Sequence, residues 1–127
     1  MPRTATTARC PWGAADDVGV SVGCTPDDSR HTNVGIFGGK VYVDRGPADR
    51  SGYSFLPYRQ AEAPIDPDAR HVHLRILVDT QSVEVFVNAG HTVLSQQVYF
   101  EPDDTVVRLY SYDGAAVFSN VTWRPAR

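Results

Sequence analysis

The sequence predicts an all-β protein, an antiparallel β-sandwich folded as a single domain. Apolar and polar residues alternate with a period of two along several short segments, as in strands with one buried face. Turn-forming residues separate these segments at short and regular intervals. Residues 74–95 read as three short strands and two tight turns, which leaves no room for a helix. Seven or eight strands are expected in all.

Each expected element follows from its local pattern. Residues 1–17 show no periodicity and predict an irregular lead-in, so the sandwich is expected to span 18–127. Pro26 with its neighbouring aspartates indicates a turn, and Gly38-Gly39 suits a two-residue hairpin. A proline-containing excursion after Gly46 is expected to include one short edge strand. The other strands are expected at 18–24, 32–37, 40–45, 106–112 and 116–124, with three more within 71–99.

The hairpins that follow residue 70 have the clearest pattern. Apolar residues alternate with polar ones over 71–79, the period of a half-buried strand. The turn over 79–82 is rich in residues that bond to their own backbone. In the next strand, 83–87, three valines point one way, and Glu84 and Phe86 point the other way. Glu84 and Phe86 therefore share one face of this strand.

Three motifs carry a resemblance to a known family. Residues 74–90 read L-R-I-L-V-D-T-Q-S-V-E-V-F-V-N-A-G, residues 41–45 read V-Y-V-D-R with Ser51-Gly52 after them, and residues 106–114 read V-V-R-L-Y-S-Y-D-G before V-T-W at 121–123. In this order and at these spacings they resemble the C-terminal β-sandwich of glycoside hydrolase family 32. That family comprises the invertases, levanases and inulinases, which cleave β-fructofuranosides. The resemblance covers residues 18–124 and implies a jelly-roll or concanavalin-like sandwich.

The resemblance implies that catalysis belongs to a separate, N-terminal five-bladed propeller. The family's catalytic motifs N-D-P-N-G, R-D-P and E-C do not occur here in their context, so no catalytic residues are expected in this chain. A retaining glycosidase needs two carboxyls about 5 Å apart, one of them with a raised pKa. The best pair here, Asp79 with Glu84, lies in a non-catalytic hairpin. Because the family's sandwich opens with further strands, the chain either begins with a divergent segment or lacks its first strand.

Carbohydrate binding is the function that the polar residues of these motifs favour. A furanose ring is small and rich in hydroxyls, so carboxylates that accept hydrogen bonds and arginines that donate them suit it. In one branch of the family such sandwiches are fructan-binding modules. We therefore expect a terminal fructose of levan or inulin as the ligand, and a propeller domain as a further partner. The expected sugar-binding residues are Asp44, Arg45, Asp79 and Glu84, with Tyr42 and Phe86 as aromatic flanks.

Each of these residues also has a structural alternative. Asp44 and Arg45 end a strand, where they could pair only with the chain just beyond it. The side chain of Asp79 is expected to cap its own turn. Glu84 could be a solvated residue of the outer face, or a partner of Arg75 across the hairpin. The same charges would then stabilise the domain rather than bind a ligand.

The aromatic residues leave the function open in the same way. Phe86 fits a core as well as a sugar platform, and Trp123 fits either the core or a surface that docks on a propeller. Two functions therefore compete: a module that binds fructan, and a purely structural domain that supports a catalytic propeller. A truncated remnant of such an enzyme is a further alternative.

Composition narrows the class of protein. The 127 residues carry a net charge of −3 without a basic stripe, which argues against nucleic acid as a partner. No stretch approaches the roughly 18 apolar residues of a membrane helix. The first ten residues lack the apolar core of a secretory signal, and localisation stays open. Cys10 and Cys24 could pair or remain thiols, and no cluster indicates a metal or cofactor.

Overall fold

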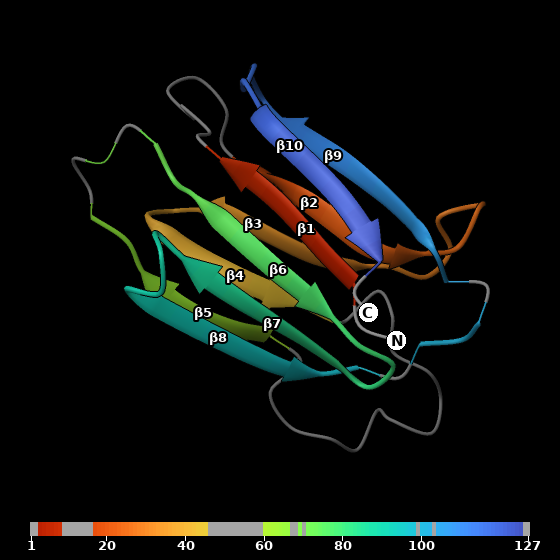
Figure 1. Ribbon diagram of the computed structural model, residues 1–127. Helices are drawn as coiled ribbons and strands as arrows, with labels where there is room; N and C mark the ends of the chain where they lie inside the picture. The colour runs from red at the N-terminus through yellow and green to blue at the C-terminus, as the bar shows by residue number, and fades with distance from the viewer. Residues whose placement is uncertain are drawn as a thin grey trace.

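The described residues form ten strands in two five-stranded antiparallel sheets (Figure 1). The computed structural model describes residues 3–8, 17–45, 60–66, 69, 71–98, 100–102 and 104–125. The strands are β1 Arg3–Ala8, β2 Asp17–Cys24, β3 Thr32–Phe37, β4 Lys40–Asp44, β5 Gln60–Pro64, β6 Leu74–Val78, β7 Ser82–Val87, β8 Thr92–Gln97, β9 Val106–Tyr112 and β10 Ser119–Pro125. The all-β sandwich expected from the sequence is confirmed.

The two sheets lie face to face. The first sheet has the strand order β10-β1-β6-β7-β8 and the second has the order β5-β4-β3-β2-β9. In Figure 1 the first sheet lies in front of the second, and β8 lies beside β5 at one side of the sandwich. Within the described residues, no helix is long and apolar enough to cross a membrane.

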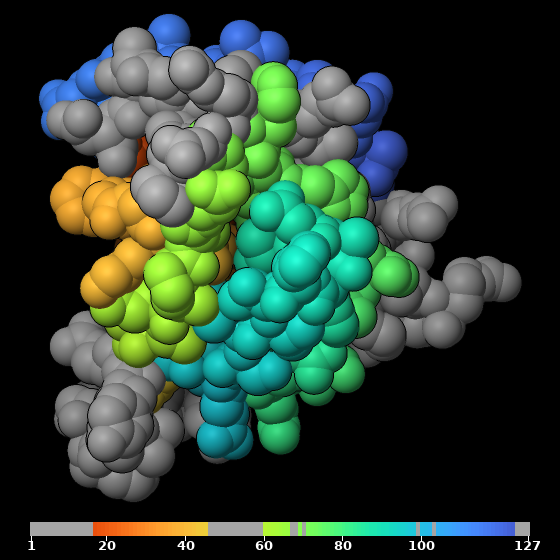
Figure 2. All heavy atoms as spheres, turned by 90° about the vertical axis from the view of Figure 1, so that its left-hand side faces the viewer, coloured from red at the N-terminus to blue at the C-terminus, as the bar shows by residue number. Residues whose placement is uncertain are grey.

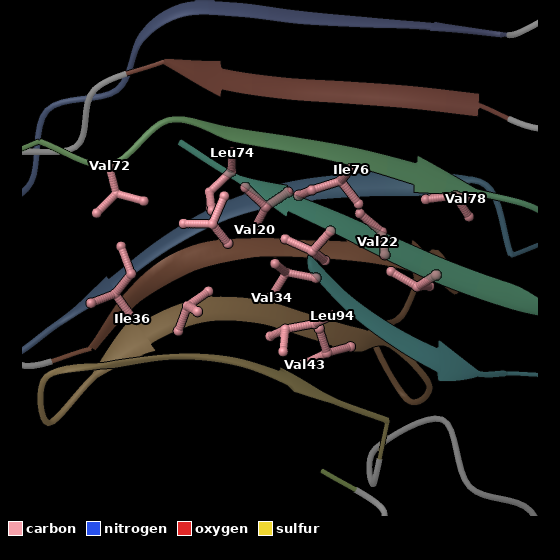
Figure 3. Packing of buried hydrophobic residues seen from close by; sticks show 14 of the residues in the cluster. Val20, Val22, Val34, Ile36, Val43, Val72, Leu74, Ile76, Val78 and Leu94 are labelled. Carbon is pink, nitrogen blue, oxygen red and sulfur yellow. The ribbon is translucent and has the colours of Figure 1, made fainter. Parts of the chain in front are cut away.

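The core between the sheets is built mainly from valine. The alternation along β2, β3, β4, β6 and β7 sends every second side chain inward, where it is buried, as Figure 3 shows for both layers. Val34, Val43, Ile76, Val83 and Val85 have no measurable exposure. The residues between them face outward, so each sheet has an outer face whose chemistry is independent of the core.

The start of the chain differs from the expected irregular lead-in. Residues Arg3–Ala8 form β1, which pairs with β6 on one side and with β10 on the other. The first strand is therefore an inner strand of the first sheet. Its sequence, R-T-A-T-T-A, has no large apolar residue, so hydrophobic periodicity could not reveal it, although β-branched threonine suits a strand. The next strand, β2, begins at Asp17.

The turns follow their predicted chemistry. Gly38 and Gly39 both have positive φ, 61° and 77°, which lets them join β3 to β4 in a two-residue hairpin. Gly90 has φ 92° in the turn between β7 and β8. The short edge strand expected after Gly46 is β5, which pairs with β4 only. Cys24 is a buried free thiol, while Cys10 lies outside the described residues.

Candidate functional site on the outer face of the second sheet

Three of the six expected sugar-binding residues lie on or just after β4, in the second sheet. Tyr42 and Asp44 alternate with the buried Val41 and Val43, so their side chains belong to the outer face. Arg45 follows the strand and is only 5% exposed. Tyr42 and Asp44 line the same hollow, and Arg45 does not line it.

The other three residues lie in the first sheet, on the opposite side of the molecule. Glu84 and Phe86 alternate with buried valines of β7 and occupy the outer face of that sheet. Asp79 lies in the β6–β7 turn, where its Oδ1 accepts a hydrogen bond from the Thr80 amide at 2.7 Å, as expected for a residue that caps its turn. Because the core separates the two outer faces, the six residues do not converge on one site.

The register also decides which residue faces Glu84. Glu84 pairs with Leu77 on β6 and with Ser95 on β8, whereas Arg75 pairs with Phe86. Together with Asp79, Glu84 lines a hollow of about 500 Å³. Its remaining lining residues are Thr80, Gln81, Ser82, Ser95, Gln96 and Gln97. This hollow is polar and contains no aromatic ring.

Two tyrosines cross the outer face of the second sheet. Tyr42 of β4 and Tyr110 of β9 reach toward each other over Gly19 and Gly35, which occupy the two strands between them. The hydroxyls are 2.5 Å apart, and the Tyr42 hydroxyl donates to Asp17 Oδ1 at 2.7 Å. Since a phenol has one proton to donate, Tyr110 donates to Tyr42.

Glycine at these two positions makes the arrangement possible. A Cβ on Gly35 would lie 2.5 Å from the Tyr110 hydroxyl and 2.8 Å from the Tyr42 hydroxyl. On Gly19 it would lie 2.7 Å from the Tyr110 hydroxyl and would also collide with the backbone of β3. The missing side chains therefore leave the space that the two rings fill.

Burial and hydrogen bonding keep both phenols protonated. Loss of solvation raises the pKa of Tyr42 far above its usual value, and the neighbouring Tyr110 and Asp17 raise it further. Burial also raises the pKa of Tyr110. The pair therefore acts as a fixed chain of donors that ends on the Asp17 carboxylate.

A hollow of about 200 Å³ opens beside this chain of hydroxyls. Its lining residues are Asp17, Asn33, Phe37, Tyr42, Asp44 and Gln60. They come from neighbouring positions on β2, β3, β4 and β5, since Asn33 pairs with Asp44 and Asp44 pairs with Gln60. The hollow is large enough to admit one sugar ring.

Three lining residues are each oriented through one polar atom while the other carries no hydrogen bond within the described residues. Asp17 Oδ1 accepts from Tyr42, which leaves Oδ2 as an acceptor. Asn33 Oδ1 accepts from Ser21 at 2.6 Å, which leaves the Nδ2 amide as a donor. Gln60 Nε2 donates to Glu62 at 3.2 Å, which leaves Oε1 as an acceptor. Such a set of acceptors and a donor matches the hydroxyls of a sugar.

The end of the sandwich has a third hollow, of about 320 Å³, but its polar groups are already used. Asp104 bonds Arg30 at 2.6 Å and also accepts from the Glu101 amide. Asp79 accepts from the Thr80 amide, as described above. The arrangement is that of a stabilised loop junction. No group of three potential metal-binding side chains occurs in the described part of the chain.

The sequence reasoning missed Asp17, Asn33, Gln60 and Tyr110. Asp17 was assigned to the irregular lead-in, and Gln60 belongs to an edge strand whose position was not predicted. The available signal was the alternation of Asp17, Gly19 and Ser21 with buried valines, because it places a carboxylate and a side-chain-free position on one outer face.

Comparisons with known proteins agree with this architecture. The family model described as "Glycosyl hydrolases family 32 C terminal" matches residues 3–125. The levanbiose-producing levanase of Bacillus subtilis is 42% identical over 113 residues, which cover 87% of this chain and 22% of that protein. The raffinose invertase of Escherichia coli is 40% identical over 89 residues, covering 65% of this chain and 18% of that protein. The chain thus spans about a fifth of each relative.

A solved structure shows the same fold at lower sequence identity. The exo-inulinase of Aspergillus awamori superposes with a TM-score of 0.80 and 24% identity, over 94% of this chain and 23% of that one. The fold defines the protein as an all-β sandwich domain. More specifically, the chain belongs to the C-terminal domain family of the family 32 glycosyl hydrolases, a non-catalytic domain.

Proposed function

We propose that this chain is a non-catalytic accessory domain of a β-fructofuranoside hydrolase and that it binds a terminal fructose of levan or inulin. The relatives' printed names, levanase and invertase, support the substrate class. The observation that carries the proposal is the outer-face hollow, in which Asp17, Asn33 and Gln60 each present one polar atom without a hydrogen bond in the described part of the chain. Asp44 adds a carboxylate to the same hollow.

Rigidity of the hollow favours binding over a merely polar surface. Asp17 is held by Tyr42, Asn33 by Ser21, and Gln60 by Glu62. Side chains that are already oriented lose little conformational freedom when a ligand arrives, so more of the interaction energy appears as affinity. The Tyr42 ring contributes an apolar wall against which the carbon face of a sugar ring can pack.

Titration calorimetry with fructose and short levan and inulin oligosaccharides tests the proposal on two matched variants. Asp44→Asn and Glu84→Gln each neutralise one outer-face carboxylate, on opposite sheets. The proposal predicts saturable heat from the wild-type chain, a loss of about tenfold or more in affinity for Asp44→Asn, and unchanged affinity for Glu84→Gln. Thermal unfolding of both variants checks that they are folded.

Two results would contradict this assignment. Loss of binding in Glu84→Gln, with Asp44→Asn unaffected, would move the sugar to the hollow of Asp79 and Glu84 on the first sheet. No heat from a folded wild-type chain would remove sugar binding altogether and favour a structural role.

A structural role has an observation of its own in its favour. Leu109 on β9 pairs with the buried Val20, so its side chain faces the space between the sheets. Trp123 on β10 pairs with Ala5, which in turn pairs with the buried Ile76. Leu109 and Trp123 are nevertheless 44% and 36% exposed, because β9 and β10 are the edge strands on that side. This apolar edge is suited to contact with a catalytic domain.

A chimera tests that second function. The domain replaces the corresponding segment of the levanbiose-producing levanase, and Leu109→Ser is introduced into the chimera and into the isolated chain. A supporting domain predicts a larger drop in melting temperature in the chimera, because only there would the edge be covered. Equal shifts in both would argue against docking through this edge.

A further inference from the structure

The hollow on the second sheet continues into a second hollow along the same strands. This second hollow, of about 270 Å³, is lined by Phe37, Gly38, Lys40, Tyr42, Gln60 and Glu62. Phe37, Tyr42 and Gln60 line both hollows. The two therefore form one groove over β3, β4 and β5, with Tyr42 in its floor. In Figure 2, orange side chains of the β3–β4 region project beside the yellow-green of β5.

The groove is longer than one sugar ring. Asp44 lines only the first hollow and Lys40 only the second, and these two residues of β4 are four residues apart, about 13 Å along a strand. The cross-strand partners repeat this spacing, since Asn33 pairs with Asp44 at one end and Phe37 pairs with Lys40 at the other. A single furanose would fill only one end of it.

The two ends differ in chemistry. The first end presents the Nδ2 donor of Asn33, the Oε1 acceptor of Gln60 and the carboxylate of Asp44, which suit the many hydroxyls of a terminal sugar unit. The second end has Phe37, which faces outward and is 57% exposed. An exposed phenylalanine has no packing role in the core, and its ring offers an apolar surface for the carbon face of a second ring.

The polar side chains at the second end are also held in place by hydrogen bonds within the protein. Lys40 Nζ donates to Glu62 Oε1 at 2.9 Å, and Gln60 Nε2 donates to Glu62 Oε2 at 3.2 Å. These contacts hold Glu62 with both oxygens paired. The ammonium of Lys40 has three protons, so it has further hydrogen bonds to donate. Donors on one wall and an aromatic ring on the other suit an internal unit of a sugar chain.

We propose that this groove binds two consecutive sugar units of a fructan, the terminal unit beside Asn33 and Asp44, and the second unit against Phe37 and Lys40. The inference rests on the proposed function and adds a second subsite to it. The domain then recognises the last two units of a fructan chain, and it binds an oligosaccharide more tightly than free fructose.

Calorimetry of the 127-residue chain with fructose and with the difructose levanbiose tests the inference. The wild-type chain should bind levanbiose at least about tenfold more tightly than fructose. Phe37→Ala should weaken levanbiose binding by about three- to tenfold and fructose binding by less, so that most of the preference for levanbiose is lost. Phe37→Tyr keeps the ring and should retain the wild-type preference.

Tyr112→Ala is the matched control. Tyr112 is 59% exposed on the same outer face, across Asp17 from Phe37, and lines neither hollow. Its loss should leave the preference for levanbiose unchanged. If Tyr112→Ala abolished that preference while Phe37→Ala did not, the second subsite would be overturned. Equal affinities of the wild-type chain for fructose and levanbiose would also overturn it while leaving the proposed function intact. Absence of binding by either sugar would refute both.

Discussion

Replacing Gly35 with alanine should disturb the candidate site although no residue that lines the hollow is substituted. The new Cβ would lie 2.5 Å from the Tyr110 hydroxyl, 2.7 Å from the Val18 carbonyl and 2.8 Å from the Tyr42 hydroxyl. All three distances are far below ordinary van der Waals contact. The carbonyl belongs to a paired strand and cannot move easily, so the tyrosine rings must shift.

The cost can be worked from what the rings would lose. Displacement breaks or weakens the hydrogen bond between the tyrosines and the one from Tyr42 to Asp17, each worth about 1 kcal/mol. Crowding of a packed region adds about 1–3 kcal/mol. Alanine restrains the unfolded chain more than glycine does and returns about 0.5–1 kcal/mol. We therefore expect Gly35→Ala to lower the free energy of unfolding by about 2–4 kcal/mol.

Urea unfolding followed by circular dichroism measures this loss directly, with the slope of the transition as a check on two-state behaviour. The double variant Gly35→Ala with Tyr110→Phe removes the nearest colliding atom and should recover part of the loss, which gives a coupling energy for the pair. A Gly35→Ala chain within about 0.5 kcal/mol of wild type would refute the close-packed arrangement of the two tyrosines over the glycines.

Three further predictions follow from single groups. Thr32→Val should stabilise the domain by about 1 kcal/mol in urea unfolding, because the Thr32 hydroxyl is buried and has no hydrogen-bond partner among the described residues. Thr25→Val should destabilise it, because the Thr25 hydroxyl accepts a hydrogen bond from the Arg30 amide at 3.1 Å. Burial raises the pKa of Cys24 to about 11, so in a Cys10→Ser chain the thiol should resist iodoacetamide at pH 8 until denaturant is added; rapid labelling of the folded chain would contradict this. The pKa of Tyr42 is raised in the folded state, so its stabilising contribution is complete below the unfolded tyrosine pKa of about 10 and is lost as pH rises above that value. The melting temperature of the wild-type chain should therefore fall beyond pH 10. It should fall less steeply in Tyr42→Phe. Parallel curves for the two chains would exclude Tyr42 as the cause.

The strands of the core could be predicted from the sequence because burial imposes a simple period. The valines of β2 and β7 alternate with polar residues, and hydrophobic patterning needs nothing more. In contrast, β1 has only small and polar residues, and its place in the sheet depends on backbone pairing with β6 and β10, strands about 70 and 115 residues further along the chain. Local pattern carries no information about such partners.

The candidate site could be predicted only in part, for a related reason. Alternation places Asp44 on one strand face with Tyr42, and Glu84 on one with Phe86, yet it could not say that the two strands belong to different sheets. The strand order decides that Asp44 lies beside Asn33 and Gln60 rather than near Glu84. The sequence suggests one site for all six expected sugar-binding residues because their chemistry is alike, but the sandwich places them on two different sheets.

The most direct test of the account follows a fructose or levanbiose titration of the isotopically labelled chain by two-dimensional NMR of the backbone amides. The account predicts saturable shifts at Asn33, Gly35 and Asp44 on the second sheet, extending to Lys40 only with levanbiose. The chemical shifts of the first-sheet amides around Glu84 should not change. Shifts confined to Glu84 and its neighbours, or no shifts from a folded sample, would contradict a sugar site on the outer face of the second sheet.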